Sequence, residues 1–178
     1  TYASGSGRDL VFRYTIQSDE IDSNGISIGA NAIALNSGTI RDPAGNDGTL
    51  THSAVDNNSS YKVDTTAPSV DNFTMNDTEL KIGDNATVTL VFSETVCVVS
   101  SACGGVVFSN ADITVDNGSL TTMTTSDDNK TWSGTFTPTD DIEAPSNTLS
   151  LGTSYTDLAG NNGPDNQTAN YEVDTREP

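Results

Sequence analysis

The sequence has few basic residues, and this shortage excludes two classes of partner. Its 178 residues include seven lysines and arginines against 25 aspartates and glutamates, which gives a formal net charge of −18. Proteins bind nucleic acid largely through lysine and arginine contacts to phosphate, so a nucleic acid partner is excluded. Attraction to an anionic membrane surface is excluded by the same sign of charge. The acidic excess fits either a solvated, soluble surface or the binding of hard cations such as calcium.

Long apolar runs are also missing. No run approaches the ~20 residues of a transmembrane helix, so direct insertion into a membrane is not expected. No stretch shows the i, i+3, i+4 apolar stripe of an amphipathic helix. No signal peptide is visible, but the sequence reads as part of a larger protein, so this says nothing about secretion. The abundant threonine, serine, asparagine, aspartate and glycine favour short strands joined by turns.

Cysteine and histidine are scarce. The two cysteines, Cys97 and Cys103, are separated by five residues, which is not a zinc-binding CxxC spacing. A small disulfide-closed loop in an oxidising compartment is therefore favoured over two free thiols. The single histidine, His52, has no cysteine beside it, and no nucleophile-elbow motif occurs. The sequence thus predicts a protein that is not an enzyme.

Two short motifs occur twice, in the same order. Asp42-Pro-Ala-Gly-Asn46 precedes Tyr61-Lys-Val-Asp64, and Asp157-Leu-Ala-Gly-Asn161 precedes Tyr171-Glu-Val-Asp174. A duplication of this kind indicates tandem repeats. The first Tyr-x-Val-Asp motif runs into Pro68, and proline cannot donate a hydrogen bond to a sheet, so a strand should end there in a stiff connector.

We therefore expect a first domain at residues 1–66 and a second at residues 67–178. The second contains about seven short segments of alternating apolar and polar residues, as in an immunoglobulin-like β-sandwich. The first contains only three or four, so it is expected to be the C-terminal part of such a repeat. The predicted fold is all-β: tandem immunoglobulin-like β-sandwiches, the first truncated at its N-terminus.

Several of these segments make specific predictions about burial. Residues 10–16 alternate as a half-buried strand should, and residues 32–35 and 106–108 are expected to be short strands. Within residues 86–92, Val88, Leu90 and Phe92 share one face of the predicted strand. Trp132 lies in another alternating segment, which favours packing in the core over stacking on a sugar.

The motifs of the second domain resemble a known family, the bacterial Ig-like domains of large repetitive surface proteins, including RTX and biofilm adhesins. The matching segments are Val63-Asp-Thr-Thr-Ala-Pro68, Val91-Phe-Ser-Glu94, Ala111-Asp-Ile-Thr-Val115, Thr135-Phe-Thr-Pro138, Asp157-Leu-Ala-Gly-Asn161 and Tyr171-Glu-Val-Asp174. The Cys97–Cys103 insertion and the end Thr175-Arg-Glu-Pro178 depart from the family pattern. The resemblance implies an extracellular extender on the bacterial cell surface that is often loaded with calcium.

Acidic and amide side chains predict a calcium site at the boundary between the domains. In an immunoglobulin-like sandwich, the turn holding Glu94 and the turn at Asp157–Asn161 lie at the end where the chain enters. Both turns should therefore face Asp64, and together Asp64, Glu94, Asp157 and Asn161 offer the hard oxygen atoms that calcium prefers. Alternatively, Asp157 only caps the backbone amides of a tight turn. Asp42 and Asn46 in the first domain, and Asp174 at the end of the second, should serve equivalent joints to other domains.

The leading hypothesis for function is a calcium-stiffened spacer in a large bacterial adhesin involved in adhesion or biofilm formation. Its partners would be calcium and neighbouring Ig-like repeats of the same polypeptide. The alternative is an adhesive module that uses the Cys97–Cys103 loop to bind a glycan or a protein from a host or a biofilm matrix.

Overall fold

The structure is a computed structural model that describes residues 2–6, 9–99, 103, 105–126 and 129–178. The chain divides into two compact units, Thr1–Thr66 and Ala67–Pro178. Both are built from short strands and turns, and within the described residues the only helix is a three-residue 3-10 turn. The predicted all-β class is therefore confirmed. No described helix is long and apolar enough to cross a bilayer.

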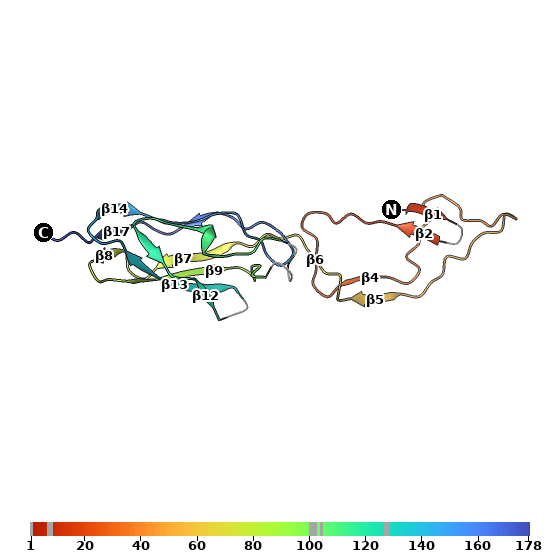
Figure 1. The fold of residues 1–178 in the computed structure, drawn as a ribbon. Helices are drawn as coiled ribbons and strands as arrows, with labels where there is room; N and C mark the ends of the chain where they lie inside the picture. Colours follow the sequence, from red (N-terminus) through yellow and green to blue (C-terminus); the bar gives the residue numbers. More distant parts are fainter. Residues whose placement is uncertain (1, 7–8, 100–102, 104, 127–128) are drawn as a thin grey trace. The chain divides into compact units, whose positions relative to one another are not determined.

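The second unit contains one larger sheet, whose strands follow the order β11-β13-β9-β7, with β12 also pairing with β13. All the pairs in this sheet are antiparallel. Its strands (Figure 1) are β7 (Val70–Met75), β9 (Ala86–Phe92), β11 (Gly118–Leu120), β12 (Thr124–Thr125) and β13 (Thr131–Pro138).

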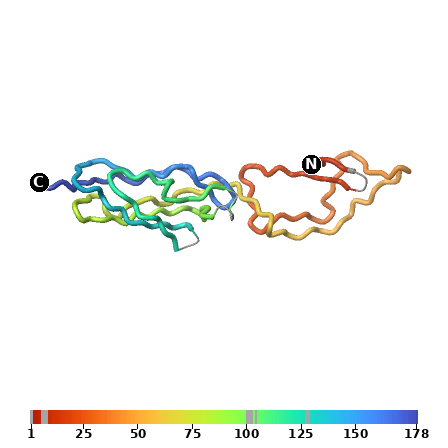
Figure 2. Tube along the Cα trace, viewed as in Figure 1, coloured from red at the N-terminus to blue at the C-terminus, as the bar shows by residue number. Residues whose placement is uncertain are grey.

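Two smaller sheets complete the second unit, with the orders β14-β17-β8 and β10-β15-β16. The strand β17 pairs antiparallel with β14 and parallel with β8. The elements are β8 (Glu79–Lys81), η1 (Asn110–Asp112), β10 (Ile113–Val115), β14 (Glu143–Asn147), β15 (Leu149–Leu151), β16 (Asn166–Gln167) and β17 (Tyr171–Asp174). Figure 2 traces these strands from yellow at β8 to blue at β17.

The core of the second unit forms because alternate residues of its strands point inward. In β9, Ala86 is 1% exposed and Val88, Leu90 and Phe92 are 0% exposed. The inward face predicted for this strand is therefore confirmed. Burying each of the larger side chains contributes about 1.5–3 kcal/mol relative to leaving it in water.

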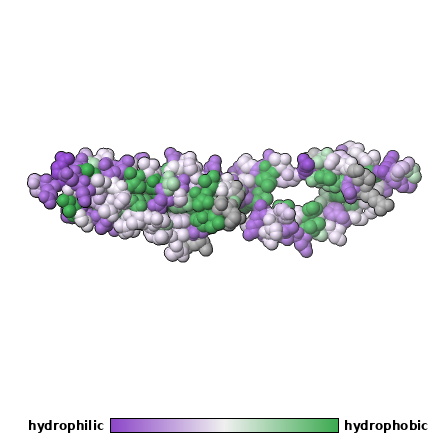
Figure 3. Space-filling model, viewed as in Figure 1, coloured by the Kyte–Doolittle hydropathy of each residue, from purple (hydrophilic) through white to green (hydrophobic). Residues whose placement is uncertain are grey.

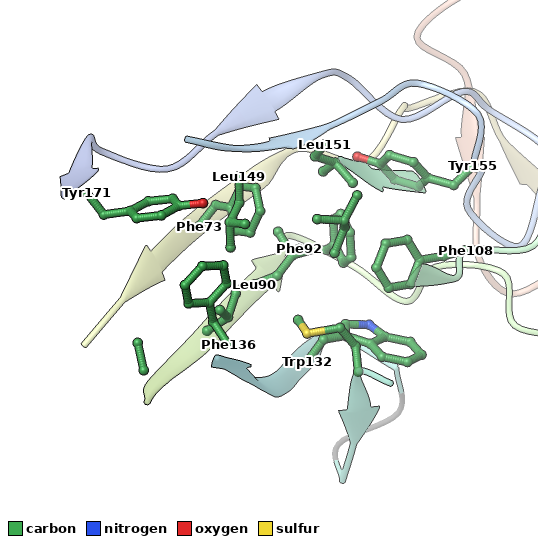
Figure 4. Close-up of a cluster of buried hydrophobic side chains, with 14 of the residues drawn as sticks. Phe73, Leu90, Phe92, Phe108, Trp132, Phe136, Leu149, Leu151, Tyr155 and Tyr171 are labelled. Atoms are coloured by element: carbon green, nitrogen blue, oxygen red, sulfur yellow. The ribbon is translucent and has the colours of Figure 1, made fainter. Parts of the chain in front are cut away.

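Aromatic rings connect the strands across this core (Figure 4). Phe92 contacts Phe108 and Tyr155, with ring centroids 5.4 and 5.2 Å apart, and Phe136 of β13 contacts Tyr171 of β17 at 5.1 Å. Trp132 is 8% exposed, and its indole N–H donates to the carbonyl of Asn129 at 3.1 Å. Trp132 is thus a core residue, as predicted.

The described residues of the first unit form three two-stranded ribbons, β1-β2, β3-β6 and β4-β5. All three pairs are antiparallel. The strands are β1 (Tyr2–Ser6), β2 (Asp9–Phe12), β3 (Ile21–Asp22), β4 (Ile26–Ile28), β5 (Val55–Asn58) and β6 (Val63–Asp64). Two-stranded ribbons are only marginally stable in water without a layer packed against them.

Three sequence-based strand predictions were wrong. The strand expected at residues 10–16 ends at Phe12, and Phe12 and Tyr14 are 52% and 73% exposed, so it is not half-buried. Residues 32–35 form no strand and are followed by a turn, in which Asn36 has a φ of +45°. Residues 106–108 also form no strand. Alternation gives a segment an apolar face, but a strand also needs a neighbour to pair with.

Candidate metal centre

The loop from Asp157 to Asn161 is closed by the carboxylate of its first residue. Asp157 Oδ1 accepts hydrogen bonds from the backbone amides of Ala159, Gly160 and Asn161 at 2.8, 2.7 and 2.9 Å. Its Oδ2 accepts from the Asn161 side-chain amide at 2.7 Å. Gly160 has a φ of +98°, which favours glycine. The structure therefore contains the capped turn that was one of the two interpretations of this motif.

Asp157 is also buried, which is unusual for an acidic side chain. It is 0% exposed, and none of the described lysines or arginines forms an ion pair with it. Burying a carboxylate is costly unless hydrogen bonds or a positive charge compensate it. The three amide donors and the asparagine amide supply the hydrogen bonds, and a cation would supply the charge.

Glu94 lies next to this turn because of how the second unit folds. It follows β9, and two residues later Val96 forms an isolated antiparallel bridge with Asp157. A carboxylate oxygen of half-buried Glu94 lies within 4.8 Å of one from Asp157. Two ionised carboxylates at that separation repel each other by on the order of 3 kcal/mol at an effective dielectric constant of about 20. A divalent cation bound to both would turn this repulsion into attraction.

The segment leading into the second unit is fixed near Glu94. The Ser69 amide donates to Ser93 Oγ at 2.9 Å, and the Ser93 amide donates to the Ser69 carbonyl at 2.9 Å. The sequence did not predict this pair of serines, because serine is common in the chain and carries little signal. They hold the start of the unit beside the residue that precedes Glu94.

Asp64 lies at the end of β6, in the first unit, where it is half-buried and accepts a hydrogen bond from the Thr66 amide at 3.0 Å. Its counterpart in the second repeat motif, Asp174, ends β17. Asp174 is exposed and accepts from the Arg176 amide at 3.3 Å. The two aspartates thus cap the backbone two residues ahead in the same way.

The first copy of the aspartate turn, at Asp42, shares the two asparagine bonds of the second but is exposed. Asp42 accepts from the Asn46 amide at 2.8 Å and from the Asn46 side chain at 2.8 Å. The side-chain bond from Asn46, and then its backbone bond, lower the pKa of the Asp42 carboxyl. Among the described residues, neither Asp42 nor Asp174 belongs to a group of three acidic, histidine or cysteine side chains close enough to share an ion.

The cysteine loop is anchored beside the same turn. Cys97 and Cys103 form a disulfide, with their Cα atoms 5.9 Å apart. Cys97 is 0% exposed, and its amide donates to the Thr156 carbonyl at 2.9 Å. Part of the loop, residues 100–102 and 104, lies outside the described residues. The spacing of the cysteines gave no sign that this loop would be held against the residue that precedes Asp157.

His52 takes part in a local hydrogen-bond network in the first unit. Its Nε2 accepts from the Ala32 amide at 2.9 Å, and its own amide donates to Asn31 Oδ1 at 3.1 Å. These bonds connect two loops of that unit. The ring has a structural role in joining them.

Comparisons with known proteins place most of the chain in one family. Residues 64–173, more than half of the chain, match the family described as Bacterial Ig-like domain. No curated protein and no solved structure matched the chain.

Proposed function

Because the chain belongs to the bacterial Ig-like domain family, we propose that it is a spacer segment of a large bacterial adhesin whose consecutive domains are stiffened by calcium. Domains of this family are typically found in extracellular or surface proteins and are typically not enzymes. The observation that carries the proposal is the pair of carboxylates of Glu94 and buried Asp157, whose oxygens lie within 4.8 Å of each other.

The residues at this position fit calcium better than zinc or a redox metal. The side chains offered are carboxylate and amide oxygens, and calcium takes six to eight such hard ligands. A carboxylate oxygen has more than one lone pair, so Asp157 can cap its turn and still contribute to an ion. The capped turn and the calcium site are therefore compatible. Asn161 would keep the Asp157 carboxylate oriented.

We propose Asp64 as the third carboxylate of the site, which would make the ion a shared ligand of two domains. Ser69 is held next to Ser93, and Asp64 lies only five residues upstream of Ser69. Five residues can span up to roughly 16 Å, so Asp64 is within reach of Glu94 by chain length alone. The family match also begins at Asp64, which supports assigning this residue to the domain it precedes.

The proposed function follows from the binding of one ion by two neighbouring domains. An ion held by two neighbouring domains restricts bending between them, whereas carboxylates without an ion repel and let the joint bend. Asp174 would then provide the same ligand for a following domain, and Asp42 with Asn46 would serve a joint of the first domain. A series of such domains would hold a binding module away from the cell surface, in adhesion or in a biofilm.

Calcium titration of the intact chain tests this proposal. We expect calcium at 100 times its dissociation constant to stabilise the domain by about 2.7 kcal/mol and to narrow the range of lengths seen by small-angle scattering. Asp157→Asn removes the charge and keeps an oxygen that can accept from the three backbone amides, but its NH2 replaces the oxygen that accepts from Asn161. It should therefore weaken calcium binding by at least about tenfold and lower stability without calcium by roughly 1–2 kcal/mol. Asp140→Asn, which makes the same change at an exposed aspartate of the second unit, is the matched control.

A second variant separates a shared ion from one held within a single domain. Asp64→Ala should weaken calcium binding and abolish the effect of calcium on length, because the ion would lose its ligand from the other domain. Calcium binding that is identical in Asp64→Ala and the parent chain would rule out sharing. Absence of any calcium-dependent stabilisation in the parent chain would rule out the site altogether.

One observation favours the alternative of a ligand-binding module. A hollow of about 470 Å³ lies beside the cysteine loop, lined in part by Val98, Phe108, Met123 and Trp132. Half-buried Val98 follows Cys97 directly, so the disulfide holds one wall of the hollow. Binding on glycan or protein arrays that Val98→Asp abolishes would support this function. If no glycan or protein on the arrays binds, the spacer remains the better proposal.

A further inference from the structure

Thr156, the residue just before the Asp157 turn, is bound by both arms of the cysteine loop. From the first arm, the Cys97 amide donates to the Thr156 carbonyl at 2.9 Å. From the second arm, which follows Cys103, the Val106 carbonyl accepts from the Thr156 amide at 3.0 Å. Thr156 itself is buried. The position of the turn is therefore tied to both arms of the loop.

The two arms are also joined to each other, by a hydrogen bond and by a covalent link. The Phe108 amide of the second arm donates to the Cys97 carbonyl at 2.8 Å, and the disulfide connects Cys97 to Cys103. A cross-link removes conformations that the chain between its ends could otherwise adopt. The disulfide therefore limits how far the two arms can separate around Thr156.

Glycine at position 105 lets the second arm come very close to Thr156. A Cβ added to Gly105 would lie 2.0 Å from Thr156 Oγ1 and 2.7 Å from Thr156 Cβ. Atoms that are not bonded cannot approach so closely, so any other residue here would push the arm and Thr156 apart. Close approach of the backbone to a neighbour is one reason why a position requires glycine. The loop and the residue before the turn are thus packed in direct contact.

The first arm begins beside the other carboxylate of the candidate site. Glu94 lies three residues before Cys97, and Val96 between them forms the isolated antiparallel bridge with Asp157. The carboxylate oxygens of Glu94 and Asp157 lie within 4.8 Å of each other. The first arm thus follows directly from Glu94, whereas Asp157 follows the residue that both arms bind. A shift of the first arm against Thr156 would change the separation of the two carboxylates.

Apolar side chains occur on both the loop and the turn. Val99 and Val106 of the loop and Leu158 of the turn are exposed. Figure 3 shows hydrophobic surface over the end of the second unit that carries the loop. Apolar groups beside charged ligands lower the local dielectric constant, which strengthens the attraction between a carboxylate and a cation. The loop therefore contributes to the surroundings of the site as well as to its geometry.

We propose that the Cys97–Cys103 disulfide is a positioning element of the calcium site, which holds Asp157 at the distance from Glu94 that one shared ion requires. This role rests on the proposed function, because it concerns the same carboxylates. With the disulfide closed, both arms hold Thr156 and the two carboxylates are in place before the ion binds. With the disulfide reduced, the arms can separate, and calcium binding must also restore their positions. The disulfide form therefore binds calcium more tightly.

Calcium affinity should then depend on the oxidation state of the two sulfur atoms. A dithiol reductant breaks the S–S bond: the two cysteine sulfurs gain two electrons and two protons, and the dithiol is oxidised to its own disulfide. Coupling between two equilibria is reciprocal, so calcium must favour the closed disulfide over the two thiols by the same factor by which closure tightens calcium binding. Both directions of the coupling can be measured.

Isothermal titration calorimetry of the chain 1–178 with calcium, before and after reduction by dithiothreitol, tests the proposal. We expect the reduced chain to bind calcium roughly tenfold more weakly, as when a group that orients a metal ligand is removed. Cys97→Ser combined with Cys103→Ser should give the same loss without a reductant. Fluorescence of Trp132 verifies that the second unit is folded in each case. Terbium can replace calcium, and its luminescence lifetime should show more coordinated water once the disulfide is open.

A glycine variant moves the loop while leaving the disulfide intact. Gly105→Ala should weaken calcium binding roughly as much as reduction does, because the added methyl group displaces Thr156. Gly152→Ala is the matched control, since its Cβ would lie 3.6 Å from the Asp112 carbonyl oxygen, an ordinary contact, and calcium affinity should not change. In Asp157→Asn, which already lacks the charge of the ligand, reduction should have little further effect.

Failure of the disulfide role and failure of the calcium site give different results. Equal calcium affinity of the oxidised and reduced chains, both folded, would overturn the role of the disulfide and leave the proposed function in place. Absence of calcium binding by the oxidised chain would overturn the proposed function and the role of the disulfide with it. A loss of affinity that Gly152→Ala shares with Gly105→Ala would also overturn this role, because it would reflect general destabilisation.

Discussion

The aspartate turn occurs in both units, with two asparagine bonds in common and opposite surroundings. Asp42 and Asp157 each accept a hydrogen bond from the amide and from the side chain of the asparagine four residues later. Asp42 is exposed, whereas Asp157 is 0% exposed. The local sequence is therefore sufficient to form the turn, and the rest of the unit determines whether the turn is a surface feature or part of the interior.

The tyrosine strands extend the comparison to the core. Tyr171 contacts Phe136 and donates a hydrogen bond to the Asp116 carbonyl. Tyr61 occupies the same place in its motif and is 62% exposed. How much a motif residue contributes to the stability of its unit therefore depends on the strands that pack against it. Paired substitutions in the two units can measure this dependence directly.

The largest difference in stability between the two units should come from substitution of their tyrosines, Tyr171 and Tyr61. Tyr171→Ala should lower the free energy of unfolding of the second unit by about 3–5 kcal/mol, because it leaves a cavity between two sheets. Tyr61→Ala should cost about 0.5 kcal/mol or less, as at other exposed positions. Urea unfolding followed by the fluorescence of Trp132 reports on the second unit, and amide exchange reports on the first. Equal costs would show that Tyr61 is packed in solution.

Substitution of the two turn aspartates should give a smaller difference in stability between the units. Asp157→Ala should destabilise the second unit by about 2–3 kcal/mol, since three backbone amides in a buried turn lose their acceptor. At Asp42→Ala, water can reach the amides, so the cost should be about 0.5 kcal/mol or less. Urea midpoints and the exchange rates of the amides at Gly45 and Asn46 measure the two effects. A large loss of stability in Asp42→Ala would mean that this turn is buried in solution.

The smallest effect on stability, taken per pH unit, should come from loss of the Tyr171 hydroxyl proton at high pH. Burial, and then the charge of Asp116, raises the pKa of Tyr171 to about 12, from an ordinary value of 10.0. Between those values the unfolded chain loses this proton while the folded chain keeps it, so stability falls as pH rises, by at most about 1.4 kcal/mol per pH unit. Tyr171→Phe should reduce the slope of urea midpoint against pH above pH 10.0. An unchanged slope would contradict this.

Much of the second unit could be predicted from its sequence because its strands alternate clearly. The inward face of β9 and the core position of Trp132 follow from that pattern. The proximity of Glu94 to Asp157 could also be anticipated, because the fold class places their turns at the same end. These are properties that local pattern and topology determine together.

Other features depend on contacts that no local pattern encodes. The alternation in residues 10–16 predicted a half-buried strand, yet Tyr14 is 73% exposed because the described residues of its unit provide no covering layer. The cysteine spacing suggested a closed loop but not its anchoring to Thr156. The pair Ser69 and Ser93 was missed because serine is common in this sequence and so carries little signal.

The parallel pairing of β8 with β17 has a mechanical consequence. The chain leaves the second unit just after β17, and β8 lies near the start of the same unit. Tension applied to the two ends would slide these strands along each other, so their hydrogen bonds would have to break together instead of opening one at a time like a zipper. Under such tension, the second unit would resist unfolding longest at this strand pair.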